Sequence, residues 1–217
     1  MAKVWIEVCV DSAEGLAEAV AGGADRIELC AALDVGGLTP SAGLMQLAAH
    51  CPMPVLAMIR PRSGDFVFSE AEVGIMLADI AAVRAAGLAG VVLGASLPDG
   101  RLDGAILGRL VKAASGLDLT LHRAFDLVPD MAPAIDLAVD LGFRRILTSG
   151  QAATAAEGRA GLERGFALAA GRIAIMPGAW VLSKTTFHPN CVKEWEAGGK
   201  LGTASTVRLP AASNMLA

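Results

Sequence analysis

Two short segments repeat the same order of residues that can bind a metal or move a proton. Ile6–Cys9 reads IEVC, and Ile27–Cys30 reads IELC 21 residues further along the chain. Because side chains alternate between the two faces of a strand, Glu and Cys share one face in each segment, and the apolar residues share the other. Thiolate sulfur suits Cu(I), whereas a zinc site usually takes four ligands. The repeat therefore leaves two interpretations: a Cu(I) site at Cys9 and Cys30, or two small buried cysteines.

The repeat also indicates where these side chains lie. The apolar faces must pack against helices, so the Glu and Cys faces should point into the interior, where Glu7 and Glu28 can contact a substrate. Neighbouring parallel strands lie roughly 4.8 Å apart. We therefore expect Cys9 and Cys30 to approach each other closely, at matching depth.

A second group of polar residues follows the fifth predicted strand. His122–Asp126 reads HRAFD, which places an imidazole, a guanidinium and a carboxylate within five residues. Histidine titrates near neutrality and either neighbour can tune it, so His122, Arg123 and Asp126 form a candidate catalytic set for acid-base chemistry. The structural alternative is that Arg123 and Asp126 form an ion pair within the loop.

Residues that suit an anion follow the third, sixth and seventh predicted strands. The segment Arg60–Phe66 reads RPRSGDF, and arginine can grip a carboxylate or a phosphate with two hydrogen bonds. In barrels the phosphate site commonly lies after the last two strands. These patterns predict a small anionic or phosphorylated substrate. The candidate binding residues, beside Glu7 and Glu28, are Arg60, Arg62, Asp65, Ser149, Gly150 and Gly178.

The elements that must position these residues alternate along the chain. Short runs rich in Val and Ile predict strands at 4–10, 26–30, 55–59, 90–93, 117–122, 145–148 and 172–176, with an eighth within 201–209. Ala-rich segments predict helices at 13–21, 41–50, 69–86, 103–115, 131–141 and 153–170. The alternation fits a closed TIM-type (β/α)8 barrel or an open doubly wound sheet. Because no G-x-G-x-x-G follows the first strand, we predict the barrel, whose chemistry lies at the carboxyl ends of the strands.

The composition excludes several other classes of protein. The 217 residues are 54% hydrophobic with a net charge of -4, which predicts a single folded domain over 1–217. There is no Tyr and no basic run, so nucleic-acid binding is not expected. Apolar runs are broken before the roughly 18 residues that a membrane span needs, so no membrane association is expected either. The four cysteines fit free thiols in the cytoplasm rather than a disulfide framework.

Several stretches together carry a family resemblance. They are 7–12 (EVCVDS), 23–30 (GADRIELC), 36–41 (GGLTPS), 58–62 (MIRPR), 64–66 (GDF), 122–126 (HRAFD) and 146–151 (ILTSGQ). In these stretches the chain resembles the CutC family, whose members are named as copper homeostasis proteins. The resemblance implies a TIM-type barrel, a cytoplasmic location and a role in copper handling, with Cu(I) held by Cys9 and Cys30.

The chain departs from the family pattern over 180–217. The family has a glycine triplet where this chain has Gly178, Ala179 and Trp180, and it has a Glu and a His where this chain has 198–202. Family members also continue past the position of Ala217, so we expect the final barrel helix to be absent. We then expect either a poorly ordered end or a partner chain, in a homo-oligomer, that covers the gap. Two other functions stay open beside copper binding: a barrel enzyme with His122 as general acid or base, and a scaffold that acts through oligomer contacts.

Overall fold

The computed structural model of the chain describes residues 5–178 and the backbone of 204–208. The strands are β1 (Trp5–Val10), β2 (Arg26–Leu29), β3 (Val55–Met58), β4 (Gly90–Leu93), β5 (Asp118–Leu121), β6 (Arg145–Thr148), β7 (Ala174–Pro177) and β8 (Ala204–Arg208). The helices are α1 (Ala13–Ala21), α2 (Ala42–Ala48), α3 (Glu70–Ala86), α4 (Gly104–Ala113), α5 (Met131–Asp140) and α6 (Arg159–Ala169). Two 3-10 turns, η1 (Leu33–Val35) and η2 (Arg123–Leu127), follow β2 and β5.

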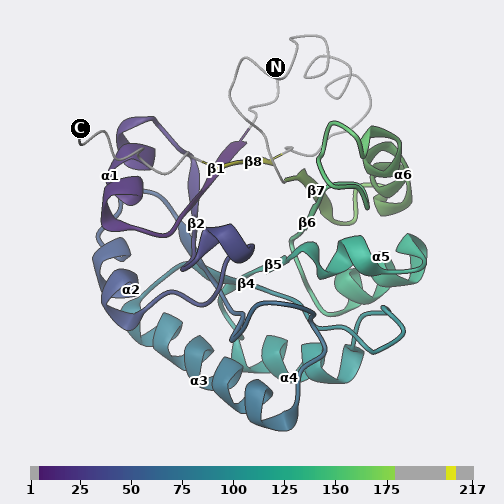
Figure 1. The fold of residues 1–217 in the computed structure, drawn as a ribbon, viewed down its shortest axis with the longest axis horizontal. Helices are drawn as coiled ribbons and strands as arrows, with labels where there is room; N and C mark the ends of the chain where they lie inside the picture. Colours follow the sequence, from purple (N-terminus) through teal and green to yellow (C-terminus); the bar gives the residue numbers. More distant parts are fainter. Residues whose placement is uncertain (1–4, 179–203, 209–217) are drawn as a thin grey trace.

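The strands form one parallel sheet that curls into a ring. Their order is β7-β6-β5-β4-β3-β2-β1-β8, and β8 both pairs with β1 and lies against β7. The helices lie outside this ring, from α1 round to α6 (Figure 1). The predicted TIM-type barrel is therefore confirmed, including a strand within 201–209. The predicted absence of a final helix falls after Arg208 and lies outside the described residues, as does most of the divergent segment 180–217.

Local sequence signals explain where several helices begin and end. The Ser12 hydroxyl accepts a hydrogen bond from the backbone of Gly15 at the start of α1. Ser69 and Glu72 form a reciprocal capping box at the start of α3. Helix α3 then ends at Gly87, whose φ of 77° is readily adopted only by glycine. These polar caps satisfy backbone groups that a helix end leaves without partners.

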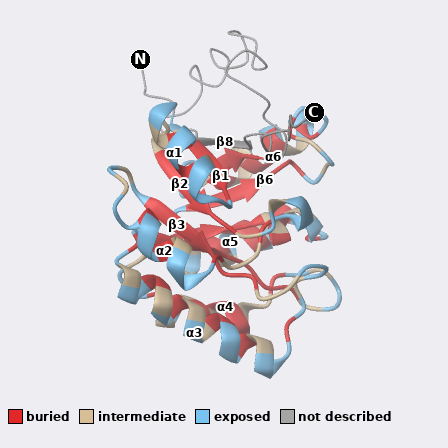
Figure 2. Cartoon of the chain, turned by 60° about the vertical axis from the view of Figure 1, so that its left-hand side comes forward, coloured by how far each residue is buried: buried red, intermediate tan, exposed pale blue. Residues whose placement is uncertain are grey.

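The main hydrophobic core lies between the sheet and the surrounding helices. Outward-facing strand residues such as Val8, Ile27 and Val91 pack there with helix residues such as Met76 and Leu107. Figure 2 shows the strands buried and the outer faces of the helices exposed. Because apolar residues fill the outer layer, the inward faces of the strands are left to carry polar side chains. None of the helices among the described residues is long and apolar enough to span a bilayer.

Helix α6 begins six residues later than the predicted start at 153. The cause lies at its first turn, where Gly158 packs directly on the loop that follows β6. A Cβ atom at Gly158 would lie 1.7 Å from the carbonyl oxygen of Ser149, so only glycine permits this approach. The backbone N–H groups of Thr154 and Glu157 instead bond each other's side chains in a turn before the helix. This contact between distant segments has no signature in the local Ala-rich pattern.

Candidate functional site

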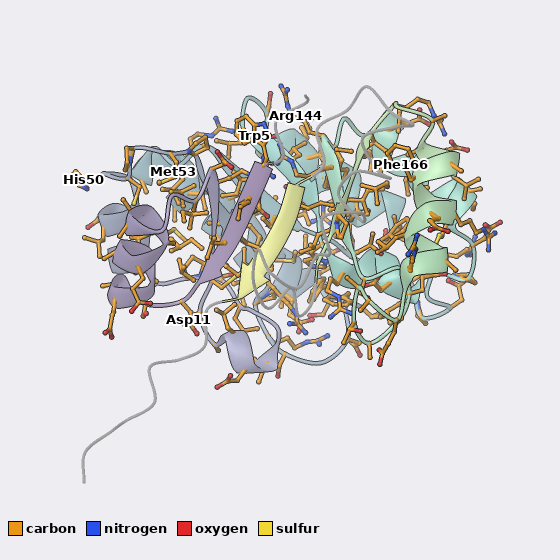
Figure 3. The ribbon with its side chains drawn as sticks, turned by 90° about the horizontal axis from the view of Figure 1, so that it is seen from above. Trp5, Asp11, His50, Met53, Arg144 and Phe166 are labelled. Atoms are coloured by element: carbon orange, nitrogen blue, oxygen red, sulfur yellow. The ribbon has the colours of Figure 1, made fainter. Side chains whose placement is uncertain are left out.

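The polar residues of the site lie at the end of the barrel where the strands finish. In Figure 3, Trp5 at the start of β1 and Arg144 just before β6 mark one end, and Asp11 just after β1 marks the other. His50 and Met53 lie far out on the helical side in the same view. Cys51, between them in sequence, is half-buried against the outer core and takes no part in the site.

A cluster of two thiols and a carboxyl group lies on β1 and β2. Cys9 pairs in register with Glu28, which places Cys30 two residues closer to the barrel mouth. The expected matching depth of Cys9 and Cys30 is therefore wrong, because the carboxyl group of Glu28 lies level with Cys9. The Cys30 thiol donates to Glu28 Oε1 at 3.7 Å, and Cys9 also hydrogen-bonds Glu28. Glu28 thus links the two thiols.

All three groups of this cluster hold their protons more firmly than usual. Burial, followed by the neighbouring Glu7, raises the pKa of Glu28 to about 8. Burial, followed by the charge of Glu28, raises the pKa of Cys9 and of Cys30 well above the ordinary thiol value. A low-dielectric interior disfavours the charged forms, so the cluster is largely uncharged at neutral pH.

An ion pair that sequence reasoning missed lies one layer deeper in the barrel. Arg26 Nε donates to Glu7 Oε2, and Arg26 Nη2 lies 3.5 Å from the sulfur of Met176. Both charged side chains are buried. Arg26 precedes Glu28 by two residues, and this spacing was the signal that it shares the inward face. The predicted substrate residue Glu7 therefore already has a partner, although its Oε1 has none among the described residues.

His122 lies at the carboxyl end of β5 as a buried, neutral imidazole. Its Nδ1 accepts a hydrogen bond from the backbone N–H of Ala124 at 3.1 Å, which places the proton on Nε2. Nε2 is buried without a partner among residues 5–178. Burial and then Arg60 lower the pKa of His122 to about 3. The expectation that His122 titrates near neutrality is therefore wrong. Gly94 permits this position, since a Cβ there would lie 2.5 Å from the imidazole ring.

Arg123 and Asp126 form the ion pair that the structural alternative predicted. Arg123 Nε donates to Asp126 Oδ2 at 2.7 Å, and Arg123 Nη2 donates to the Ser149 hydroxyl at 2.9 Å. Asp126 also accepts hydrogen bonds from the backbone N–H groups of Ser149 and Gln151 and from the hydroxyl of Thr148. The carboxylate therefore clamps the loop after β6. A catalytic role for this pair stays a prediction.

The other candidate anion-binding residues divide into an inner and an outer group. Arg60 is buried, and its terminal nitrogens donate to the carbonyls of Val35, Gly37 and Gly64. Arg62 and Asp65 instead pair with each other on the loop surface. In Figure 2 exposed residues lie on the outer helices and loops, and the strands inside them are buried. The structure brings Arg60 into the site and leaves Arg62 and Asp65 outside it.

The remaining candidates lie on β6 and β7. The Ser149 hydroxyl is hydrogen-bonded to Asp126 and to the carbonyl of Ala152. Gly150 has a φ of 74° and packs against the start of α6. The N–H of Gly178 donates to the carbonyl of Thr148 at 2.9 Å. These three residues shape the mouth between β6 and β7, and a direct contact with an anion stays a prediction.

Two further residues at the mouth had no clear signal in the sequence. Phe66 lies between the side chains of Arg60 and His122, and Ser96 follows β4 with a buried hydroxyl group. Within the described part of the chain, no group of three or more His, Cys, Asp or Glu side chains is placed to hold a metal ion. A metal at this end of the barrel would therefore depend on a small donor set such as the two thiols.

The fold and the site define a TIM-type barrel with a buried polar group at the carboxyl ends of its strands, and comparisons with known proteins make the class specific. The CutC family model matches residues 4–189. A CutC family protein of Rhizobium meliloti is 63% identical over 185 residues, which cover 85% of this chain and 76% of that one. This chain belongs to the CutC family.

One solved structure agrees with this assignment, and a second shares the fold. A CutC protein of Streptococcus agalactiae, which carries a provisional assignment to copper homeostasis, is 30% identical with a TM-score of 0.86, covering 96% of this chain and all of that one. An aldolase, QR15, is 12% identical with a TM-score of 0.66 and covers 95% of this chain and 92% of its own. At that identity the aldolase shows the shared fold alone.

Proposed function

We propose that the protein takes part in copper homeostasis by binding Cu(I) through Cys9 and Cys30. The observation that carries this proposal is the pair of free, buried thiols on adjacent strands, which Glu28 links at the barrel mouth. The S. agalactiae relative with its provisional copper-homeostasis assignment supports the same function. Soft sulfur ligands favour Cu(I) over harder cations.

The chemistry of this donor set fits Cu(I) as a cargo ion. Thiols bind a metal as thiolates, so each Cu–S bond displaces a proton whose pKa is raised here. The positive ion offsets the charge of the thiolates that burial otherwise disfavours. Affinity should therefore rise with pH, because protons and Cu(I) compete for the same sulfur atoms. Glu7 and Glu28 would line this site without being its principal ligands.

Removing both thiols should remove tight Cu(I) binding. We expect the Cys9→Ser, Cys30→Ser double variant to bind Cu(I) at least about 100-fold more weakly than the parent, since hydroxyl oxygen is a poor ligand for this soft ion. The measurement is an anaerobic titration against a colorimetric Cu(I) chelator. Cys51→Ser is the matched control, because Cys51 lies outside the site. Equal affinity in the parent and the double variant would contradict the proposal.

The location and the assembly of the protein form part of the same proposal. We infer a cytoplasmic protein, because reduced thiols persist in that compartment. We also propose a homo-oligomer. Cell fractionation and light scattering are the corresponding measurements.

A second candidate function is an enzyme that acts on a small anionic or phosphorylated substrate. The observation that favours it is the neutral imidazole of His122, whose buried Nε2 proton has no acceptor among the described residues. A neutral imidazole can donate a hydrogen bond to a substrate oxygen as negative charge develops there. Arg60 and Arg123 would hold the anion, with Asp126 orienting Arg123.

This enzymatic role makes a separate prediction about His122. For any anionic metabolite that the protein is found to turn over, His122→Phe should lower kcat by about 100-fold or more, the usual loss when one hydrogen-bond donor to a developing charge is removed. A thermal-shift screen identifies the metabolite, and steady-state kinetics measure the loss. His50→Phe is the control, since His50 lies on the outer side of the helices (Figure 3). Unchanged kcat in His122→Phe would contradict this role.

A further inference from the structure

Three buried hydrogen-bond donors without partners lie at the ends of three neighbouring strands at the barrel mouth. They are Arg60 Nε, the Ser96 hydroxyl and His122 Nε2, and none has an acceptor among residues 5–178. The three residues are 6%, 4% and 2% exposed, respectively. An orphaned buried donor costs roughly 1–3 kcal/mol, so most native proteins contain few of them. Three of them at consecutive strand ends indicate a place where a ligand supplies the acceptors.

Phe66 holds this position in the structure. Its ring centroid lies 4.6 Å from that of His122, and the Arg60 guanidinium carbon lies 4.9 Å from the same ring. The backbone carbonyl of Phe66 accepts a hydrogen bond from the N–H of Ser96 at 2.9 Å. Arg60, Ser96 and His122 follow the consecutive strands β3, β4 and β5, so neighbouring strand ends bring the three donors to one side of the mouth.

We propose that Arg60, Ser96 and His122 bind a carboxylate group of a small organic ligand, and that the Phe66 ring occupies the place of this ligand in its absence. The site uses none of the thiols, so it is independent of copper binding. It deepens the second candidate function by naming the ligand class, but it requires binding alone and no turnover.

The number of donors and their charge favour a carboxylate over a phosphate. A carboxylate offers about four lone-pair positions on two oxygens, enough for the three donors. Arg60 brings one positive charge, while the His122 imidazole is neutral and Ser96 is uncharged. The single negative charge of a carboxylate balances this set, whereas a phosphate monoester carries about -1.5 to -2. Three of the four other guanidinium hydrogens of Arg60 already bond backbone carbonyls, which fixes its Nε in place.

The Phe66 ring offsets part of the cost of the unpartnered donors. An aromatic face beside a guanidinium contributes about 0.5–1 kcal/mol, which partly offsets the missing acceptor of Arg60. A ligand that displaces the ring must exceed this contribution. Phe66 is itself only half-buried and lies on a loop rather than in a strand, so its side chain can leave without breaking the sheet.

The test uses Phe66→Ala, which should leave a cavity with the three donors at its wall. Benzoate, a phenyl ring that carries a carboxylate, should bind this variant at least about 10-fold more tightly than benzyl alcohol, its neutral counterpart. It should also bind the variant more tightly than the parent, in which Phe66 competes. Isothermal titration calorimetry without copper gives these affinities. Val67→Ala, in the same loop but exposed, should behave as the parent does.

A second variant separates carboxylate recognition from simple filling of a cavity. Adding Ser96→Ala to Phe66→Ala should weaken the binding of benzoate by about 5-fold or more. The affinity for benzyl alcohol should stay unchanged. Any of three results would overturn the inference. They are equal affinity for benzoate and benzyl alcohol, tighter binding of inorganic phosphate than of benzoate, and no binding by a folded Phe66→Ala protein. If the protein fails this test but binds Cu(I) through its thiols, the copper proposal stands and the carboxylate site does not. If it binds benzoate as expected but does not bind Cu(I), the carboxylate site stands and the copper proposal does not.

Discussion

The free energy of unfolding should fall by about 2 kcal/mol as the pH rises from 6.5 to 8, through the titration of Glu28. The pKa of this buried carboxyl group is raised from 4.5 to about 8. The folded protein therefore binds about one more proton than the unfolded chain at pH 6.5, and this excess falls to about half a proton at pH 8. Stability from such a group is complete below the unfolded pKa and is lost as the pH rises through the folded pKa.

His122 should produce the opposite slope on the acid side. Its pKa is lowered from 6.5 to about 3, so between these values the unfolded chain binds the extra proton. Stability from this group is present above pH 6.5 and is lost as the pH falls towards 3. Between about pH 4.5 and 6.5 the two slopes cancel. The two groups together predict a plateau there, with losses on both sides.

Two variants assign these slopes to their residues. Glu28→Gln should flatten the curve above pH 6.5, and His122→Gln should flatten it below pH 4.5. Urea unfolding followed by circular dichroism at half-unit steps from pH 3.5 to 8.5 gives the curves. Glu18→Gln is the control, because Glu18 is exposed on α1. A parent protein whose stability between pH 6.5 and 8 changes no more than that of Glu28→Gln would contradict the assignment.

The alternation of side chains along strands is enough to predict which residues enter the barrel. Glu7, Glu28 and His122 are buried on the inward side, as their period-2 spacing indicates. The relative depth of these side chains in the barrel could not be predicted in the same way. Cys30 lies two residues beyond the level of Cys9 because strands in a closed barrel are staggered, and this stagger is a property of closure rather than of any one strand.

The hydrogen-bond partners of Arg60 could not be predicted from the sequence, for a related reason. A cationic loop predicts an anion, yet the terminal nitrogens of Arg60 bond the carbonyls of Val35, Gly37 and Gly64. Backbone carbonyls are present at every position, so no residue type marks the ones that converge on a guanidinium. Only the folding of the 31–38 loop and of the loop after β3 brings them there. The same holds for Gly158, whose contact with Ser149 delays the start of α6.

Replacing Asp126 with Ala should lower the free energy of unfolding by about 2–4 kcal/mol. The carboxylate, whose side chain is 7% exposed, pairs with Arg123 and accepts from the backbone N–H groups of Ser149 and Gln151. Without it, these donors and the hydroxyl of Thr148 lose their acceptor at once. Each buried donor left unpaired costs roughly 1–3 kcal/mol, and the half-exposed Arg123 adds little because water can solvate it.

Chemical denaturation of Asp126→Ala and Asp99→Ala measures this difference. Asp99 also pairs with a nearby arginine in a loop, but both partners are more than half exposed, so its loss should lower the stability far less than the loss of Asp126. Asp126→Asn keeps one accepting oxygen and should fall between Asp126→Ala and the parent. Equal stability of Asp126→Ala and Asp99→Ala would show that the loop after β6 does not depend on this carboxylate. A full loss in both Asp126 variants would instead mean that its charge, through Arg123, holds the loop in place.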